Sequence, residues 1–302
     1  NKVIGLAIAN GIVAMAGALL AQYKGSANIN DGHNAQVSGL IDMVRVETFD
    51  GLAGWEESYR KEIQTATHGK PDVVGGSVRA DSSPAWRKAK LLAHEVQTTA
   101  FVDKNIAKLS PAAYAQKAQG YALTALRREI NKLIINGDGS DSPEFFGFIN
   151  AKNTKGENIF DTSSVNAVDE DALRSMVFGY GGSEELSPNA RLILDKINLD
   201  ALGKIKIGAD DKRSLFDISL TGNSGTIKSG GLIVPYTIAS AIGSKTLAYG
   251  DPMAYMLALF GSYTIRVDES VKSVERMIAI LGDVLAGGNL VADKGMLIAS
   301  LT

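Results

Sequence analysis

One stretch of the chain, residues 110–136, repeats apolar side chains at the spacing of a helix face. The apolar positions are Tyr114, Ala118, Tyr121, Ala122, Ala125, Leu126, Ile130, Leu133 and Ile134. Ser110 followed by Pro111 is typical of a helix start, because the hydroxyl accepts first-turn amides and proline needs no amide donor there. Asn136-Gly137 is typical of a helix end. The pattern predicts a helix of about 26 residues, a rod roughly 39 Å long.

Alternation of apolar and polar residues predicts strands elsewhere. Residues 40–49 match a half-buried strand, and residues 85–105 match a strand or a strand passing into a short helix. Further strands are expected at 190–194, 232–235, 263–267, 277–284 and 295–301, and further helices at 169–180 and 198–204. Glycines 222, 225, 230 and 231 indicate a turn before the strand at 232–235. One long helix followed by late strands predicts an α+β fold.

Two polar stretches predict extended segments. Residues 25–39 are rich in Gly, Asn and Ser, which indicates a linker or an arm. Residues 64–83 form a long polar excursion with several Gly and Pro residues. Loops of this length inside a domain usually carry function or contact partners.

The first segment of the chain is strongly apolar. Between Val3 and Tyr23 the strongly polar residues are Asn10 and Gln22, and about 20 apolar residues suffice to cross a bilayer. Hydropathy alone therefore predicts a membrane span, and residues 1–25 taken alone resemble a helix of a transporter permease. Nothing later in the chain repeats the pattern, so we expect a buried or mobile arm, with a membrane transporter component as an alternative that rests on residues 3–23 alone.

Length and composition limit the kinds of function. A chain of 302 residues predicts one large domain or two closely joined domains with a sizeable core. The chain has no cysteine, which excludes a disulfide framework, a thiolate metal site and a cysteine nucleophile. With 31 Lys plus Arg against 33 Asp plus Glu, it lacks the basic surplus of a dedicated nucleic-acid binder.

No motif in the sequence favours catalysis. The histidines are His33, His68 and His94. None has a second ligand at metal-site spacing, and Asp138, Asp141 and Glu144 miss the spacing of a calcium loop. Residues 222–225 (GNSG), with Lys228 and Ser229 nearby, lack the ending of a phosphate-binding loop, so a turn is the better interpretation. We therefore assign no catalytic, cofactor-binding or metal-binding residue and expect neither a cofactor nor enzymatic activity.

The order of these pieces resembles that of tailed-bacteriophage major capsid proteins, which have the Hong Kong 97-type fold. In that family a long loop precedes a strand and a spine helix, a connector of the Asn-Gly-Asp-Gly type follows, and long strands close the chain. The matching segments are residues 64–83, 90–102, 111–135, 136–139 (NGDG), 145–149 (FFGFI), 250–251, 263–267 (YTIRV) and 277–284 (MIAILGDV). The match spans roughly residues 40–302, and its specificity comes from the order and spacing of short motifs.

The resemblance implies an architecture as well as a function. The implied parts are an N-terminal arm (1–50), an extended loop region (51–90), a peripheral domain with the spine helix (91–150 and 258–290) and an axial domain (151–257 and 291–302). The implied protein is structural and assembles as hexamers and pentamers into an icosahedral head that encloses double-stranded DNA, in the host bacterial cytoplasm. Its implied partners are other copies of itself, a portal protein, scaffold or decoration proteins, and packaged DNA by non-specific proximity, with no membrane.

Some members of that family cross-link the subunits of their shells by an isopeptide bond between a loop lysine and an asparagine. Lys70 lies in the corresponding loop, but residues 268–276 (DESVKSVER) contain no asparagine where the pattern needs one. We therefore expect no self-catalysed cross-link.

Two other functions fit the sequence. An encapsulin-like compartment shell would share the fold and enclose an enzyme in place of a genome. An α+β hydrolase or transferase belongs to a different class, because one fold hosts many functions. A soluble monomer with a ligand-sized cleft would favour the enzyme.

Overall fold

The computed structural model describes residues 39–61, 85–103, 111–139, 143–181, 187–208, 213–272 and 275–302. The helices in chain order are the 3₁₀ helix η2 (Gly39–Asp42), α3 (Pro111–Asn136), α4 (Ala172–Gly179), α5 (Lys196–Lys204) and the 3₁₀ helices η3 (Ser240–Ile242) and η4 (Pro252–Ala254). The strands are β1 (Arg45–Thr48), β2 (Gly54–Arg60), β3 (Trp86–Leu92), β4 (His94–Asp103), β5 (Asp161–Thr162), β6 (Arg191–Leu194), β7 (Asp217–Thr221), β8 (Ser224–Ser229), β9 (Leu232–Ile238), β10 (Thr246–Gly250), β11 (Tyr255–Leu259), β12 (Thr264–Lys272), β13 (Met277–Leu290) and β14 (Met296–Ser300).

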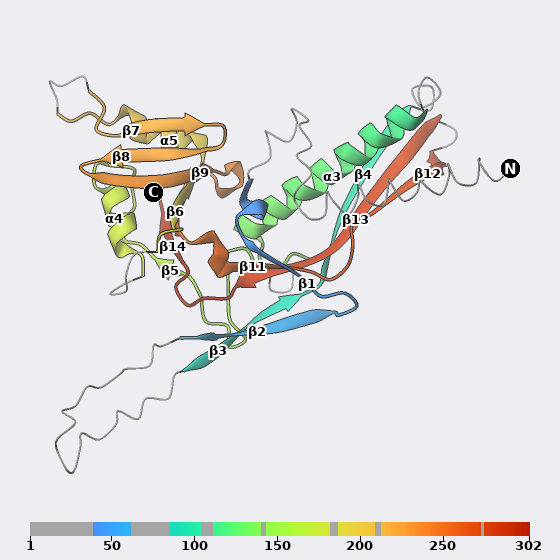
Figure 1. Ribbon diagram of the computed structural model, residues 1–302, viewed down its shortest axis with the longest axis horizontal. Helices are drawn as coiled ribbons and strands as arrows, with labels where there is room; N and C mark the ends of the chain where they lie inside the picture. The colour runs from blue at the N-terminus through green and yellow to red at the C-terminus, as the bar shows by residue number, and fades with distance from the viewer. Residues whose placement is uncertain are drawn as a thin grey trace, which may run out of the picture. The chain divides into compact units, whose positions relative to one another are not determined.

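A five-stranded sheet is built around the long strand β13. Four of its strands have the order β1-β11-β13-β12, and the fifth strand, β4, also pairs with β13 (Figure 1). Helix α3 packs on one face of this sheet, where its Ala122 meets Ile280 of β13. A Cβ atom at Gly282 would lie 2.9 Å from Thr98 Cγ2 and 3.3 Å from Leu126 Cδ1. Glycine at this position therefore lets the helix lie close to the sheet.

A seven-stranded sheet has the order β5-β14-β10-β6-β9-β8-β7. Two helices pack on one of its faces: α4 contributes Leu173 and Met176 and α5 contributes Leu202 to a core shared with Leu192 of β6 and Tyr236 of β9. Each sheet thus buries an apolar face against a helix, the arrangement expected of an α+β protein.

The chain after α3 returns along the end of the helix and satisfies its last carbonyls. The amide of Phe148 donates to Ile134 O at 2.9 Å and the amide of Ile149 to Ile135 O at 3.2 Å. The Asn150 side-chain amide donates to Asn136 O at 3.0 Å. Tyr255 of β11 donates its phenol to Phe146 O at 2.6 Å, and burial raises the pKa of Tyr255 well above its usual value. Residues 146–150 are therefore a fixed part of the core.

The segment that leads into β1 is also tied to α3. The amide of Ile41 donates to Asn131 Oδ1 at 2.9 Å, and Arg127 pairs with Asp42 at 2.8 Å. Leu40 and Val44 are buried. The strand expected over residues 40–49 is therefore wrong in its first half, and only residues 45–48 form a strand. Before it, the 3₁₀ helix η2 directs its apolar side chains into the core.

The other predicted elements are confirmed with shifted ends. The long helix, the helices near 172 and 198, and the strands at 191–194, 232–238, 264–272, 277–290 and 296–300 are all present. Within the described residues, 85–105 holds two strands, β3 and β4, and no helix. Strands β7, β8, β10 and β11 were not predicted. β11 is buried at every position, and a short continuous apolar run does not distinguish a strand from a helix.

Several predictions concern residues outside the described ranges. These are the arm and linker before residue 39, the polar excursion at 64–83, His33, His68, Lys70, Ser110 and Asp141. Among the described residues, no helix is both long and apolar enough to cross a membrane.

Candidate assembly surfaces

Strands β2 and β3 form a two-stranded ribbon that is separate from both larger sheets. One face of the ribbon is covered: Tyr59, Ala89 and Leu91 are buried. The ring of Trp55 on this face stacks on Phe49, with ring centroids 4.7 Å apart. The inner face of the ribbon therefore packs against the rest of the protein, and its outer face is exposed to solvent.

The anchored ribbon meets the segment after α3 through charged side chains. Glu157 accepts from the Asn153 side-chain amide at 2.8 Å and lies 3.4 Å from Arg87 and 3.8 Å from Lys61. These contacts lower the pKa of Glu157, with the hydrogen bond from Asn153 as the largest cause. Arg87 lies in β3 and Lys61 directly follows β2. The cluster therefore ties the ribbon to residues 153–157.

Asp293 lies near the same cluster and carries the opposite pKa shift. Burial raises its pKa above the usual 3.8, although Lys61 and Lys294 oppose the shift. The nearby carboxylates of Asp161 and Glu157 raise it further. The charged form of Asp293 is therefore disfavoured in the folded protein.

Asp293→Asn is expected to raise the free energy of unfolding at pH 7 by less than about 1 kcal/mol, since solvent screens a partly exposed group. Between pH 3.8 and the raised pKa, the folded state binds the proton more tightly than the unfolded state, so the wild type loses stability as pH rises through this range. The gain from the substitution should therefore vanish below pH 3.8. Urea unfolding of wild type and variant at several pH values measures this, and a loss of stability at pH 7 contradicts it.

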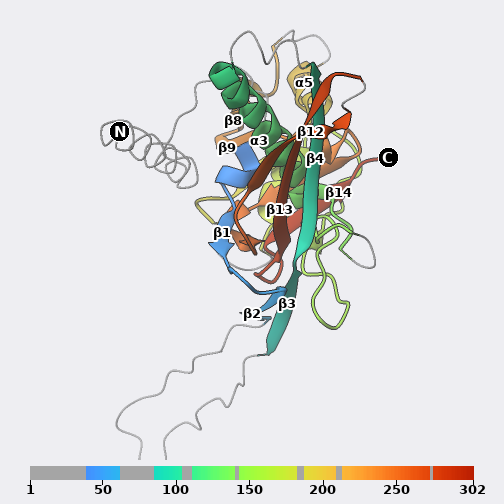
Figure 2. The same cartoon turned by 90° about the vertical axis from the view of Figure 1, so that its right-hand side faces the viewer.

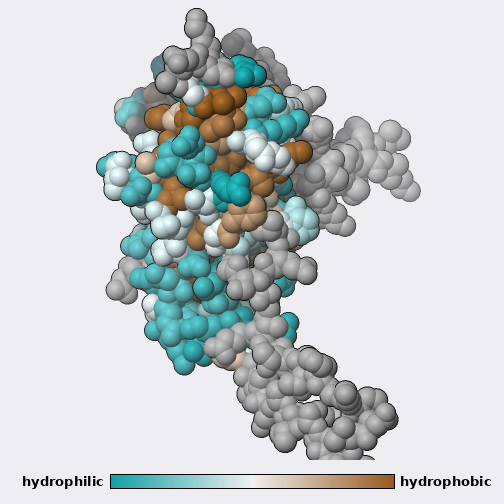
Figure 3. Space-filling model, turned by 90° about the vertical axis from the view of Figure 1, so that its left-hand side faces the viewer, coloured by the Kyte–Doolittle hydropathy of each residue, from teal (hydrophilic) through white to brown (hydrophobic). Residues whose placement is uncertain are grey.

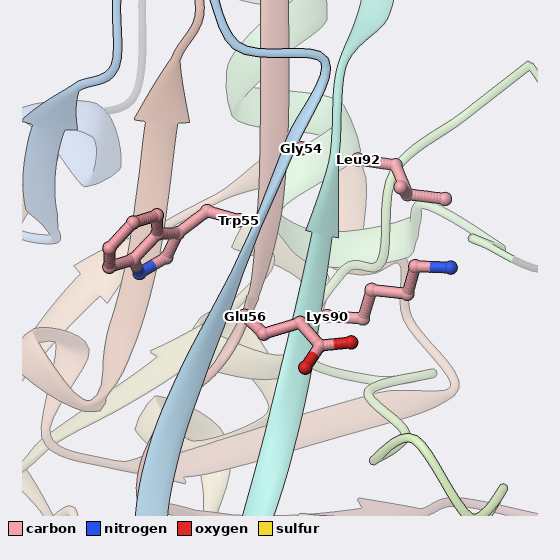
Figure 4. Close-up of a pocket in the computed structure, with 5 residues that line it drawn as sticks. All are labelled: Gly54, Trp55, Glu56, Lys90 and Leu92. Carbon is pink, nitrogen blue, oxygen red and sulfur yellow. The ribbon is translucent and has the colours of Figure 1, made fainter.

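The outer face of the ribbon is exposed and carries more basic than acidic residues. Glu56 pairs across the strands with Lys90, and Ser58 with Lys88. Arg60 lies opposite Trp86, which is 58% exposed. A shallow hollow of about 410 Å³ is bordered by Gly54, Trp55, Glu56, Lys90 and Leu92. Figure 4 shows Lys90 and Leu92 pointing to one side of the ribbon and Trp55 to the other.

The five-stranded sheet has a second face, opposite the one that α3 covers. Strand register places Glu95, Gln97, Thr99, Phe101 and Asp103 of β4 on this face, and all five are exposed. β13 adds Leu281, Asp283 and Leu285 to it, and β12 adds Arg266. Phe101 is 43% exposed and Leu285 42%. This face thus combines carboxylates with large apolar side chains, which is typical of a contact surface.

A third surface lies on the seven-stranded sheet. Helix α5 and strand β7 border a groove of about 620 Å³ whose apolar lining includes Leu199, Ile218 and Leu220. Leu220 is 59% exposed, and Ile197 of α5 is 65% exposed. Figure 3 shows apolar side chains gathered in the upper part of the view, where this sheet lies, above a mainly hydrophilic surface. Exposed apolar surface of this kind marks an interaction site.

The candidate chemical residues that the structure describes are Asp138, Glu144, His94 and the residues around Gly222. Gly222 and Asn223 form the turn between β7 and β8, so the turn expected over residues 222–225 is confirmed for its first half. It is wrong for Ser224 and Gly225, which lie in β8 and pair with β7. The amide of Asp138 approaches Glu144 Oε2 at 3.4 Å. Burial lowers the pKa of His94 in β4. Within the described residues, no group of three His, Cys, Asp or Glu side chains is placed to hold a metal ion.

Comparison with solved structures shows what the fold resembles. The capsid of an empty GTA particle matches with a TM-score of 0.67 and 14% identity, covering 88% of this chain and 90% of that one. The capsid of a native GTA particle gives 0.61 and 15%, covering 88% and 97%. A structure from Mycobacterium phage Adephagia gives 0.59 and 11%, covering 88% and 91%. These matches are evidence for the fold.

The sequence itself provides the family assignment. Comparison with curated proteins gives no match. The model of the phage capsid family, in contrast, matches residues 17–300, nearly the whole chain. The chain belongs to the phage capsid family, as a structural, non-enzymatic major capsid protein with the Hong Kong 97-type fold.

Proposed function

We propose that this protein assembles into hexamers and pentamers, and that these close into the icosahedral head of a tailed phage around double-stranded DNA. The observation that carries the proposal is the match of the phage capsid family over residues 17–300. The capsids of GTA particles, which have a similar fold, were computed with C5 symmetry. Closed symmetry lets every subunit contact several others, so weak individual contacts add up.

The three surfaces described above suit this function. In the proposed division the axial domain comprises residues 151–257 and 291–302, and it includes the groove between α5 and β7. Its exposed Ile197 and Leu220 are suited to packing around the axis of a hexamer or pentamer. The peripheral domain comprises 91–150 and 258–290, the extended loop region 51–90, and the N-terminal arm 1–50.

Electron microscopy of the expressed protein tests the proposal. Closed shells are expected, and a subunit that stays monomeric at high concentration would contradict it. Leu220→Asp should reduce shell yield at least tenfold, because a carboxylate would replace an exposed apolar side chain on the groove. Thr221→Asp is the matched control, since Thr221 is exposed on the other face of the same strand.

The content of the particles separates this function from a compartment shell. A head is expected to contain double-stranded DNA and to carry one portal, with scaffold or decoration proteins as further partners, and to form in the bacterial cytoplasm. Co-purifying enzyme cargo without DNA would favour the encapsulin-like alternative. Nuclease-protected DNA in purified particles decides between them.

The shell should lack covalent links between subunits. Residues 268–276 contain no asparagine to receive Lys70. Boiling purified particles in detergent is expected to give a single monomer band on a gel. A ladder of covalent oligomers would show that a different residue serves as the acceptor.

A further inference from the structure

The last turn of helix α3 ends in a chemically unstable pair, Asn136-Gly137. The backbone nitrogen that follows an asparagine can attack its side-chain carbon Cγ. This closes a five-membered succinimide ring and releases the side-chain nitrogen as ammonia. Water then opens the ring to aspartate or isoaspartate. Glycine in the second position favours the attack, because no side chain shields the nitrogen. Asn136 is exposed, so water reaches it.

The attacking nitrogen has a fixed partner in the folded subunit. The amide of Gly137 donates to Leu133 O at 2.9 Å, and its carbonyl accepts the amide of Gly147 at 2.8 Å. A Cβ atom at Gly137 would lie 2.0 Å from Phe145 O, so the returning chain packs closely on this peptide. To reach Cγ of Asn136, the nitrogen has to leave Leu133 O and displace the chain that covers it.

The side chain of Asn136 is held as well. Its Nδ2 donates to the carbonyl oxygen of Ala241 in η3. The backbone carbonyl of Asn136 accepts the side-chain amide of Asn150 at 3.0 Å. Figure 2 shows α3 descending from the top of the molecule towards its middle, where this last turn lies beside other elements. Both reacting groups therefore have partners that hold them in place.

We propose that Asn136 is a latent deamidation site: the folded end of α3 blocks the reaction, and opening of this end permits it. The reaction consumes one water and releases one ammonia, and the proton of the Gly137 amide passes to the leaving group. It needs no enzyme and no cofactor. The inference goes beyond the proposed shell-forming function and does not depend on it.

The product cannot restore the native contacts. A carboxylate at position 136 has no proton to donate to Ala241 O, and two oxygens facing each other repel. A negative charge is also unfavourable at the C-terminal end of a helix. Isoaspartate in addition lengthens the main chain by one carbon next to Gly137, where the packing leaves no space. A subunit whose α3 end has opened and reacted is therefore altered irreversibly.

Peptide mass spectrometry of full-length, unassembled subunits at pH 8 measures the reaction. Asn10-Gly11 is the other Asn-Gly pair in the chain and serves as an internal reference. In urea that unfolds the chain, Asn10 and Asn136 should react at similar rates. In native subunits Asn136 should react at least about tenfold more slowly than in urea, because the reaction is limited to the open fraction. Asn136→Gln should remove the signal in urea, since glutamine would have to close a six-membered ring.

A second variant tests whether the described contacts provide the protection. Asn150→Ala removes the hydrogen bonds to Asn136 O and Gly137 O. It should accelerate the native reaction at Asn136 by about threefold or more and leave the rate in urea unchanged. Asn166→Ala, at an exposed position, is the matched control and should change neither rate. Asn136→Asp mimics the product and should unfold at a lower urea concentration than wild type.

The possible outcomes separate the steps. If Asn136 reacts as fast in native subunits as in urea, the fold does not protect it and the inference is wrong. If Asn136 is unreactive in urea while Asn10 reacts, position 136 is no deamidation site. If Asn150→Ala keeps the native rate of wild type, the described contacts do not block the reaction. If Asn136→Asp is as stable as wild type, the reaction does not alter the subunit. Because the subunits are unassembled, failure to form shells leaves all four results interpretable.

Discussion

Gly288→Ala is expected to destabilise the subunit by roughly 2–6 kcal/mol. An added Cβ atom would collide with the phenol oxygen of Tyr255 and lie 2.9 Å from Phe145 Cδ2. Tyr255 and Phe145 are each 1% exposed, so neither can move into solvent. The collision would also break the hydrogen bond from Tyr255 to Phe146 O. Overpacking and a lost buried hydrogen bond therefore act together.

Urea unfolding of unassembled subunits measures the effect. Gly120→Ala is the matched control: Gly120 lies in α3 with open space around it, and alanine in a helix interior should stabilise by roughly 0.5–1 kcal/mol. In a Tyr255→Phe background the alanine should cost less, because the colliding oxygen is gone. Equal costs in both backgrounds would contradict the proposed collision.

Asn289→Leu is expected to destabilise the subunit by roughly 2–5 kcal/mol. Asn289 is fully buried. Its amide donates to Lys90 O at 3.1 Å and to Lys152 O at 2.9 Å, and its oxygen accepts the amide of Leu290 at 2.9 Å. Leucine has a similar volume but leaves these groups without their partner, and an unsatisfied buried polar group costs more than a hydrogen bond gains.

The same substitution should loosen the ribbon. Lys90 lies in β3, so Asn289 ties the ribbon to β13 as well as to residue 152. Hydrogen exchange of the β3 amides is expected to accelerate more than that of the β6 amides in the seven-stranded sheet. Asn166→Leu, at an exposed position, should change stability by less than about 0.5 kcal/mol. Equal exchange in both sheets would show global destabilisation instead.

The candidate surfaces were only partly predictable. The extended loop region was expected by resemblance over residues 51–90; β2 lies within these bounds, and β3 runs two residues past them to Leu92. The alternation of lysines with Ala89 and Leu91 is that of a half-buried strand. The local pattern does not tell which residues cover the apolar side, because these come from distant segments such as 153–157. The acidic face depends on strand register: Glu95 and Asp283 are 188 residues apart in the chain but adjacent in the sheet.

What the sequence determined by itself is the local structure. Helix α3 follows from apolar spacing and from Pro111 and Asn136-Gly137, and the late strands follow from alternation, since these signals act between residues close along the chain. The tertiary structure alone decided which strands neighbour β13, why Gly282 and Gly288 must lack side chains, and which polar groups Asn289 satisfies. Those features depend on contacts between distant segments, and a close approach of two backbones leaves no periodic pattern in either of them.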